Sequence, residues 1–182
     1  GSEMCIRDRN YIDDHFVKVK RDVAPLILCP TEYNKSWTDV EGGYLTTLGD
    51  KLNEGIKVMW TGDMVVATID KSTLDFVNPL LKRKAYIWWN FPVSDYVHGL
   101  DIKDDMSAFV SNPMEHAEAS KISLYSVADY TWNMENYDSE TSWKHAVRDL
   151  MPLHAEYLEI FAAHNSDPGQ NGHRFRREES VA

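Results

Sequence analysis

Four short apolar runs recur along the first part of the chain, and their spacing limits the fold more than any other feature of the sequence. We expect these runs to be strands, and they cover residues 26–29, 56–61, 85–91 and 107–112. The first two intervals between strand starts are 30 and 29 residues, a length that suits a strand followed by a crossover helix. Helical patterns at residues 45–53 and 70–82 fill these intervals. The sequence therefore predicts an α/β fold with parallel strands.

The chain is expected to be helical after the fourth strand. Asn112 followed by Pro113 is typical of a helix start, because asparagine caps the first turn and proline fits its first position. Apolar residues then follow at helical spacing, namely Leu124, Ala128 and Trp132, and further on Leu153, Tyr157, Ile160 and Phe161, in a helix that Pro152 can begin. We interpret this part of the chain as amphipathic helices that follow the strands.

The N-terminal residues differ from the rest. Gly1–Arg9 shows no pattern that leads into the next segment, and we interpret it as a non-native end of the chain. Asn10–Lys20 has the spacing of an amphipathic helix. Asp13 and Asp14 are expected on this helix as a solvent-facing pair.

The composition excludes some classes of function. The formal net charge is −10 at pH 7, which is unfavourable for a nucleic-acid partner. Two cysteines are too few for a disulfide framework, and no apolar run is long enough to span a membrane. Glu115, His116 and Glu118 are close in sequence, but they do not share one helix face. We therefore expect no metal site, and the sequence predicts no cofactor.

The third expected strand ends in side chains that suit a sugar. Trp88, Trp89, Asn90 and Asp95 lie at or just beyond its carboxyl end. A saccharide needs an apolar face to stack on, and amide or carboxylate groups that bind its hydroxyls. The alternative is a buried strand that runs into a proline-containing turn. The other strands also end in small polar or aromatic residues, which favours a shared ligand site at one edge of the sheet.

Six segments of the chain resemble one family of enzymes. They read CPTEYNKSW, YLTTLGDKL, MWTGD, YIWWNFPVSDYV, FVSNPMEHAEASK and HNSDPGQNGHRFRREES. In these segments and their order the chain closely resembles the catalytic region of glycoside hydrolase family 84. This family comprises β-N-acetylglucosaminidases, including the O-GlcNAc-removing enzymes and bacterial enzymes once called hyaluronidases. The matching segments cover nearly everything from Asn10 to the C-terminus.

The resemblance implies the C-terminal half of a (β/α)8 TIM barrel, strands five to eight, followed by the start of an α-helical domain. Residues 10–115 are then a partial, truncated β/α barrel, and residues 116–182 are the barrel-terminal helix and a segment of the helical domain. The missing N-terminal half of the barrel is the partner that completes the fold. Spacing alone leaves a small open sheet as the alternative. The localisation stays open, with secretion or a periplasmic location expected for a bacterial source.

The resemblance also implies removal of terminal β-linked N-acetylglucosamine from a glycoconjugate, with retention of configuration. In this family the 2-acetamido oxygen of the substrate attacks the anomeric carbon and forms an oxazoline, assisted by two adjacent aspartates. These aspartates belong at the end of the fourth strand of the barrel, in a segment that we do not find in this chain. We therefore expect the chain alone to be inactive. The alternative is a non-catalytic N-acetylglucosamine-binding remnant or an inactive gene fragment.

Most of the family's substrate-binding wall is matched residue by residue. Cys29, Tyr33, Thr61, Val65 and Trp88 match residues that surround the N-acetyl group, and Asn90, Asp95 and Asn112 match residues that hydrogen-bond the sugar or its acetamido group. Each also has a plainer interpretation: Cys29 as a buried apolar residue, Tyr33 and Thr61 as turn residues, and Asn112 as a helix cap. We expect the segment 97–105, which is shorter than in the family, to alter the rim near Asp95.

Overall fold

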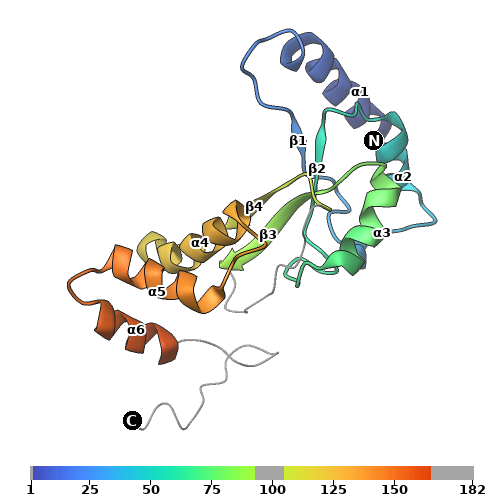
Figure 1. Cartoon of the computed structure of the whole chain (residues 1–182). Coiled ribbons are helices and arrows are strands. Elements are labelled where there is room, and N and C mark those ends of the chain that lie inside the picture. The colour runs from blue at the N-terminus through green and yellow to red at the C-terminus, as the bar shows by residue number, and fades with distance from the viewer. Residues whose placement is uncertain (1, 93–104, 165–182) are drawn as a thin grey trace. The chain divides into compact units, whose positions relative to one another are not determined.

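The computed structural model describes residues 2–92 and 105–164 of the 182-residue chain (Figure 1). In chain order the elements are α1 (Ser2–Ile12), a π-helical turn (Asp13–Val17), β1 (Ile27–Leu28), a 3-10 turn (Lys35–Trp37), α2 (Tyr44–Lys51), β2 (Lys57–Trp60), α3 (Lys71–Leu81), β3 (Tyr86–Pro92), β4 (Ala108–Asn112), α4 (Ala117–Trp132), α5 (Ser139–Leu150) and α6 (Ala155–His164). The chain divides into two compact units. Unit 1 consists of Gly1–Trp89 and His98–Val110, and unit 2 of Asn90–Val97 and Ser111–Ala182.

The four strands form one sheet in the order β1-β2-β3-β4. β1 and β2 are parallel, with Ile27 opposite Lys57, and β2 and β3 are parallel, with Met59 opposite Tyr86. The α/β fold with parallel strands, predicted from the spacing of the apolar runs, is confirmed. Each expected strand is present, although β1 is only two residues long. That these strands are half of a closed barrel stays a prediction.

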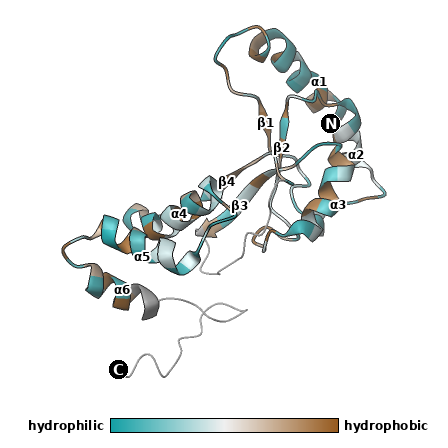
Figure 2. Ribbon diagram, viewed as in Figure 1, coloured by the Kyte–Doolittle hydropathy of each residue, from teal (hydrophilic) through white to brown (hydrophobic). Residues whose placement is uncertain are grey.

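The core of unit 1 joins the sheet to α3. Val58 and Trp60, alternate residues of β2, are fully buried. The Trp60 indole donates a hydrogen bond to the Thr73 hydroxyl at 3.2 Å. α3 has a buried stripe at helical spacing, formed by Thr73, Leu74, Val77 and Leu81. Figure 2 shows hydrophobic and hydrophilic residues together on this helix, as expected of a helix with one buried face.

α2 and α3 pack closely against each other in unit 1, and Figure 1 shows them side by side. Leu45 and Leu48 are the buried residues of α2. Gly49 permits the close approach, since a Cβ at this position would lie 2.3 Å from the Leu80 carbonyl oxygen. A larger residue at position 49 would therefore push the two helices apart.

The N-terminal helix differs from its prediction. α1 begins at Ser2 rather than at Asn10, and the helical path continues into the π-helical turn. Asp13 is only 2 % exposed, so the expectation of a solvent-facing residue is wrong. Its carboxylate lies 3.0 Å from Lys18 Nζ and accepts a hydrogen bond from Asn53 Nδ2 at 2.9 Å. Burial of Asp13 thus depends on a residue forty positions away, which helical spacing does not reveal.

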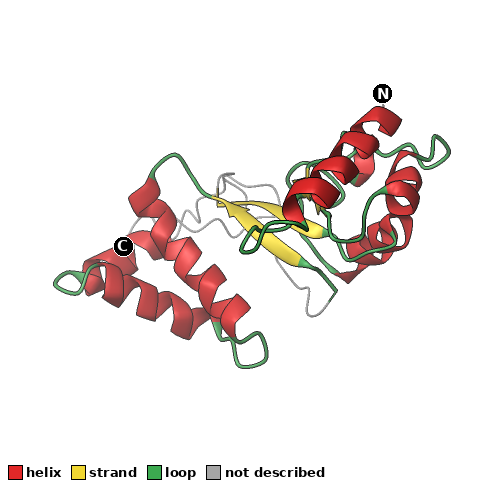
Figure 3. Ribbon diagram, turned by 90° about the horizontal axis from the view of Figure 1, so that it is seen from above, coloured by secondary structure: helices red, strands yellow, loops and turns green. Residues whose placement is uncertain are grey.

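In unit 2 the structure describes three helices, which Figure 3 shows in red. α4 begins at Ala117 with His116 as its N-cap residue, so the predicted start at Asn112 and Pro113 is wrong. The physical reason is that Asn112 is the last residue of β4, and its side chain bonds to Asn90. None of the helices in residues 2–92 and 105–164 is long and apolar enough to cross a membrane.

The apolar residues that predicted the helical faces of unit 2 are largely exposed. The exposed fractions are 90 % for Trp132, 88 % for Leu153, 74 % for Tyr157, 60 % for Ile160 and 65 % for Phe161. The buried positions of α4 and α5 are mostly small, namely Ser120, Val127, Ser142, Ala146 and Val147. α5 was not predicted as a separate helix, because small residues give a weak apolar pattern.

We predict that Asp70→Ala lowers the free energy of unfolding by about 1 kcal/mol. Asp70 caps α3: its Oδ1 accepts hydrogen bonds from the Thr73 amide at 3.1 Å and the Ser72 hydroxyl at 2.7 Å. Urea denaturation followed by circular dichroism measures the change. Asp75→Ala is the matched control, because the Asp75 carboxylate forms an exposed ion pair with Lys71. Its effect is expected to stay below about 0.5 kcal/mol.

The same cap predicts a dependence on pH. The Ser72 hydroxyl and then the Thr73 amide hold the pKa of Asp70 below its ordinary value. The charged cap therefore stabilises fully above the pKa of the unfolded chain, about 3.9, and the effect is lost as the pH falls through the lower folded-state pKa. We expect the difference between wild type and Asp70→Ala to shrink below about pH 4. An equal difference at neutral and at strongly acidic pH would contradict this.

Candidate functional site

The loops that follow β1 and β2 are joined at the carboxyl ends of these strands. Three backbone hydrogen bonds make this loop connection, from the amides of Thr61, Lys35 and Ser36 to the carbonyls of Tyr33, Gly62 and Asp63, at 2.8, 3.0 and 3.0 Å respectively. The Thr61 hydroxyl also donates to the Met64 carbonyl at 2.8 Å and lies 3.4 Å from that of Tyr33. Tyr33 and Thr61, two of the predicted wall residues, therefore lie in direct contact.

Two residues that the sequence analysis did not single out hold the loop connection in shape. Gly62 has a φ of +103°, and a Cβ there would lie 2.8 Å from Ile69 Cδ1, so a side chain does not fit. Asn34 is fully buried. Its Oδ1 accepts hydrogen bonds from the Trp37 amide at 3.1 Å and the Ser36 hydroxyl at 2.7 Å. The sequence feature that could have indicated this role is an asparagine in the segment after a strand, because asparagine favours turns.

Aromatic contacts extend the site from the β1 loop to β3. The ring centroids of Tyr33 and Trp88 are 5.5 Å apart, with a tilt of 37°. Both residues are half-buried. Tyr33, Thr61 and Trp88 thus form a continuous group within unit 1, so the structure brings together three of the predicted wall residues.

Cys29 and Val65 lie beside the same strand ends and are exposed. The interpretation of Cys29 as a buried apolar residue is therefore wrong. Partial burial of its thiol nevertheless raises the pKa of Cys29 above its ordinary value. A raised pKa keeps the thiol in its neutral, weakly nucleophilic form at physiological pH.

Asn90 and Asn112 lie together in unit 2. Asn112 Nδ2 donates a hydrogen bond to Asn90 Oδ1 at 3.0 Å, and Asn90 is 7 % exposed. Next to them, the Ser111 hydroxyl donates to the Phe91 carbonyl. The interpretation of Asn112 as a helix cap is wrong, because its amide is bonded to Asn90. Asp95 lies outside the described residues.

In the part of the chain that the structure describes, no adjacent aspartate pair follows the carboxyl end of a strand. Asp14 is exposed on the π-helical turn, and the hydrogen bond from Lys18 holds its pKa below the ordinary value. Asp105 lies before β4 and 3.6 Å from Lys71 Nζ. Asp14 thus pairs within its own helical segment, and Asp105 pairs with the first residue of α3. Residues 2–92 and 105–164 also contain no group of three or more acidic, histidine or cysteine residues that could hold a metal ion.

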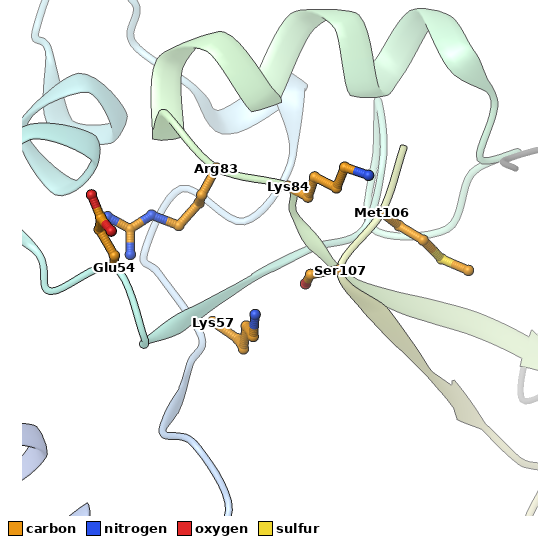
Figure 4. A pocket seen from close by; sticks show the side chains of 6 residues that line it. All are labelled: Glu54, Lys57, Arg83, Lys84, Met106 and Ser107. Atoms are coloured by element: carbon orange, nitrogen blue, oxygen red, sulfur yellow. The ribbon is translucent and has the colours of Figure 1, made fainter. Parts of the chain in front are cut away.

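A pocket in unit 1 lies at the opposite, amino ends of the strands (Figure 4). The residues that line it are Glu54, Lys57, Arg83, Lys84, Met106 and Ser107. Lys57 begins β2, Lys84 lies just before β3, and Ser107 directly precedes β4. The pocket is therefore separate from the predicted sugar wall, whose residues follow the carboxyl ends.

Arg83 gives this pocket a structural role. Its guanidinium donates four hydrogen bonds to backbone carbonyls, those of Leu52 at 2.9 Å, Asn53 at 2.8 Å, Ile56 at 2.9 Å and Leu81 at 3.0 Å. Burial lowers the pKa of Arg83, and Glu54 opposes this shift. With four donors directed to carbonyls at the end of α3 and in the turn that leads into β2, Arg83 has a role in stabilising the fold.

The sequence of the chain matches known proteins. A family profile described as beta-N-acetylglucosaminidase matches residues 3–163. The chain is 29 % identical over 125 residues to Protein O-GlcNAcase of Rattus norvegicus and to that of Mus musculus. Each match covers 60 % of this chain and 13 % of the relative, so the chain spans a small part of these relatives.

Solved structures are similar to the chain as well. The structure of CpGH84B has a TM-score of 0.85 and 32 % sequence identity, covering 98 % of this chain and 34 % of that chain. A mutant of the Thermobaculum terrenum O-GlcNAc hydrolase has a TM-score of 0.78 and 28 % identity, covering 93 % and 40 % respectively. The α/β arrangement of this chain is thus found in proteins with detectable sequence similarity.

We predict that Arg83→Ala lowers the free energy of unfolding by about 2 kcal/mol, because several carbonyls lose a charged hydrogen-bond donor. Lys57→Ala, a change to a half-buried residue of the same pocket, is the control and is expected to cost less than about 1 kcal/mol. Chemical denaturation of both variants measures the difference. Equal losses would mean that the pocket depends on its positive charge and not on the carbonyl contacts of Arg83.

Proposed function

Because the chain belongs to the beta-N-acetylglucosaminidase family, glycoside hydrolase family 84, we propose that it supplies part of the substrate-binding site of a retaining glycosidase. The substrate of this enzyme is a glycoconjugate with a terminal β-linked N-acetylglucosamine. The names of the relatives, O-GlcNAcase and O-GlcNAc hydrolase, support this substrate class. The chain covers only part of each relative, and the proposal concerns its share of the site.

The observation that carries the proposal is the contact of Tyr33 with both Thr61 and Trp88. An acetamide needs an apolar surface for its methyl group and fixed polar partners for its amide. The rings of Tyr33 and Trp88 and the neutral thiol of Cys29 supply apolar surface. Thr61 is 2 % exposed, so its proposed part is to hold Tyr33 from behind, while Val65 adds an exposed contact.

Asn90 and Asn112 are proposed as partners of the sugar and its acetamido group. Their mutual hydrogen bond of 3.0 Å fixes the orientation of both amides. An amide carries a donor and an acceptor, so a fixed pair suits a ligand rich in hydroxyls. Asp95, outside the described residues, is proposed as a charged partner for paired hydroxyls, where its hydrogen bonds are stronger than those of a neutral group.

The proposed mechanism is substrate-assisted. The 2-acetamido oxygen attacks the anomeric carbon, and an adjacent aspartate pair orients the acetamido group and transfers the proton. We propose that this chain does not supply the pair. Burial of Asp13 and the helical, ion-paired position of Asp14 support this. The pair is then provided by a missing N-terminal half of a (β/α)8 barrel, in which the present strands are numbers five to eight.

We predict that the 182-residue chain releases no chromophore from an aryl N-acetyl-β-glucosaminide, because under this proposal it does not supply the aspartate pair. Asp13→Asn and Asp14→Asn are assayed in parallel, on protein shown to be folded by circular dichroism. Turnover that disappears in these variants would show that the helical pair is catalytic and would overturn the division between binding and catalysis.

We also predict that the chain binds free N-acetylglucosamine with a dissociation constant on the order of 1 mM, and binds glucose several-fold more weakly, because glucose lacks the acetamide. Titration followed by nuclear magnetic resonance measures both constants. Trp88→Ala is expected to weaken binding of N-acetylglucosamine about tenfold, the equivalent of ~1.4 kcal/mol.

Trp132→Ala is the control for this titration. Trp132 is 90 % exposed at the end of α4 and is not a predicted wall residue, so its loss should leave binding unchanged. Trp88→Phe retains an apolar ring and is expected to bind with intermediate affinity. This variant distinguishes loss of the ring contact from unfolding of the alanine variant. Equal affinity for glucose and N-acetylglucosamine would contradict the proposed wall.

A further inference from the structure

An exposed tryptophan extends the aromatic contacts of the site. Trp37 ends the 3-10 turn after β1 and is 54 % exposed. Its ring centroid lies 4.8 Å from that of Tyr33, edge to face at 66°. Tyr33 in turn contacts Trp88 at 5.5 Å. These three residues, the aromatic row, run from two half-buried rings to one ring open to solvent.

The backbone of Trp37 is held on both sides. Its amide donates to the buried Oδ1 of Asn34 at 3.1 Å, and the Thr38 hydroxyl donates to the Asn34 carbonyl at 2.9 Å. The preceding amides of Lys35 and Ser36 donate to the β2 loop. The fixed backbone sets where the side chain begins, and the edge contact with Tyr33 limits rotation of the indole, so Trp37 loses less conformational entropy on binding than a side chain on a free loop. Trp37 is thus a preorganised apolar surface and not a loosely attached side chain.

The charges on the same loop favour an uncharged ligand. Glu32, Asp39 and Glu41 are its three carboxylates, and Lys35 is its one cation. The Lys35 ammonium lies 5.1 Å from the centre of the Phe76 ring and 3.9 Å from an oxygen of Asp63, so it is directed toward the β2 loop and α3. An anionic ligand at Trp37 would therefore meet net negative charge.

We propose that Trp37 is a stacking platform for a neutral sugar ring joined to the terminal N-acetylglucosamine, and that it makes a glycan the preferred aglycone. A pyranose has an apolar face that packs on an indole, as other apolar rings do on aromatic side chains. The inference rests on the proposed function, because it adds a second contact next to the N-acetyl wall.

The test compares three ligands on the full chain by calorimetry. They are N-acetylglucosamine, the neutral disaccharide N,N′-diacetylchitobiose, and a disaccharide in which N-acetylglucosamine is β-linked to glucuronic acid. We expect the neutral disaccharide to bind about five- to tenfold more tightly than the monosaccharide, the range of one aromatic contact. The acidic disaccharide should gain less, and the gain should not recover at low salt.

Trp37→Ala is expected to bring the disaccharide affinity down to that of the monosaccharide and to leave the monosaccharide affinity unchanged. Trp132→Ala, another exposed tryptophan, should preserve the gain. The indole resonance of Trp37 in the wild-type chain provides a measurement that needs no variant. It should shift with the neutral disaccharide and stay in place with the monosaccharide.

The outcomes separate this inference from the function on which it rests. The role of Trp37 is contradicted if the monosaccharide binds and the disaccharide binds no more tightly, or if Trp37→Ala lowers the affinity for both ligands equally. The proposed N-acetyl wall is unaffected by either result. A tighter complex with the acidic disaccharide would overturn the neutral class of aglycone. If none of the three ligands binds, both the proposed function and the platform are wrong for this chain.

Discussion

The backbone hydrogen bonds between the loops after β1 and β2 are the constraint on which the carboxyl edge of unit 1 depends. Parallel strands bring their following loops to one edge of a sheet, but they do not supply partners for the backbone groups of those loops. Here backbone amides of each loop donate hydrogen bonds to backbone carbonyls of the other loop. The geometry requires Gly62, whose positive φ and lack of space for a Cβ exclude other residues, and it requires the buried amide of Asn34. Because of these two residues, Tyr33 and Thr61 belong to one ordered surface.

The sequence predicted the strands well, because strands of a parallel sheet are apolar along their whole length and crossover helices fix their spacing. It predicted contacts between distant residues poorly. Buried Asp13 is hydrogen-bonded to Asn53, and the side chain of Asn112 is bonded to Asn90 instead of capping a helix. The periodicity of apolar residues describes one helix or strand at a time, so it does not predict such contacts. The candidate wall came from the resemblance to a family, and the aromatic row around Tyr33 came only from the structure.

The carboxylates of the described residues support a separation between binding and catalysis. A general acid needs a pKa above the ordinary value for a carboxyl group, whereas Asp14 and Asp70 have lowered pKa values because they serve as an ion-pair partner and a helix cap. Glu32 is different, since burial raises its pKa. Its oxygen accepts the Asp39 amide at 3.3 Å. Glu32 therefore closes its own loop, and its raised pKa has a structural cause.

A wall that fits an N-acetyl group recognises every terminal N-acetylglucosamine, because the acetamide is the same in all glycoconjugates. Selection among them has to come from groups that lie outside the wall and meet the aglycone. In the site that we propose, Trp37 lies in such a place, since it contacts Tyr33 on one side and solvent on the other. An exposed single apolar residue is common on protein surfaces and needs no explanation by itself. The difference here is that a fully buried asparagine fixes the backbone of Trp37 and that the ring of Trp37 contacts Tyr33, so the exposed ring is held next to the proposed wall.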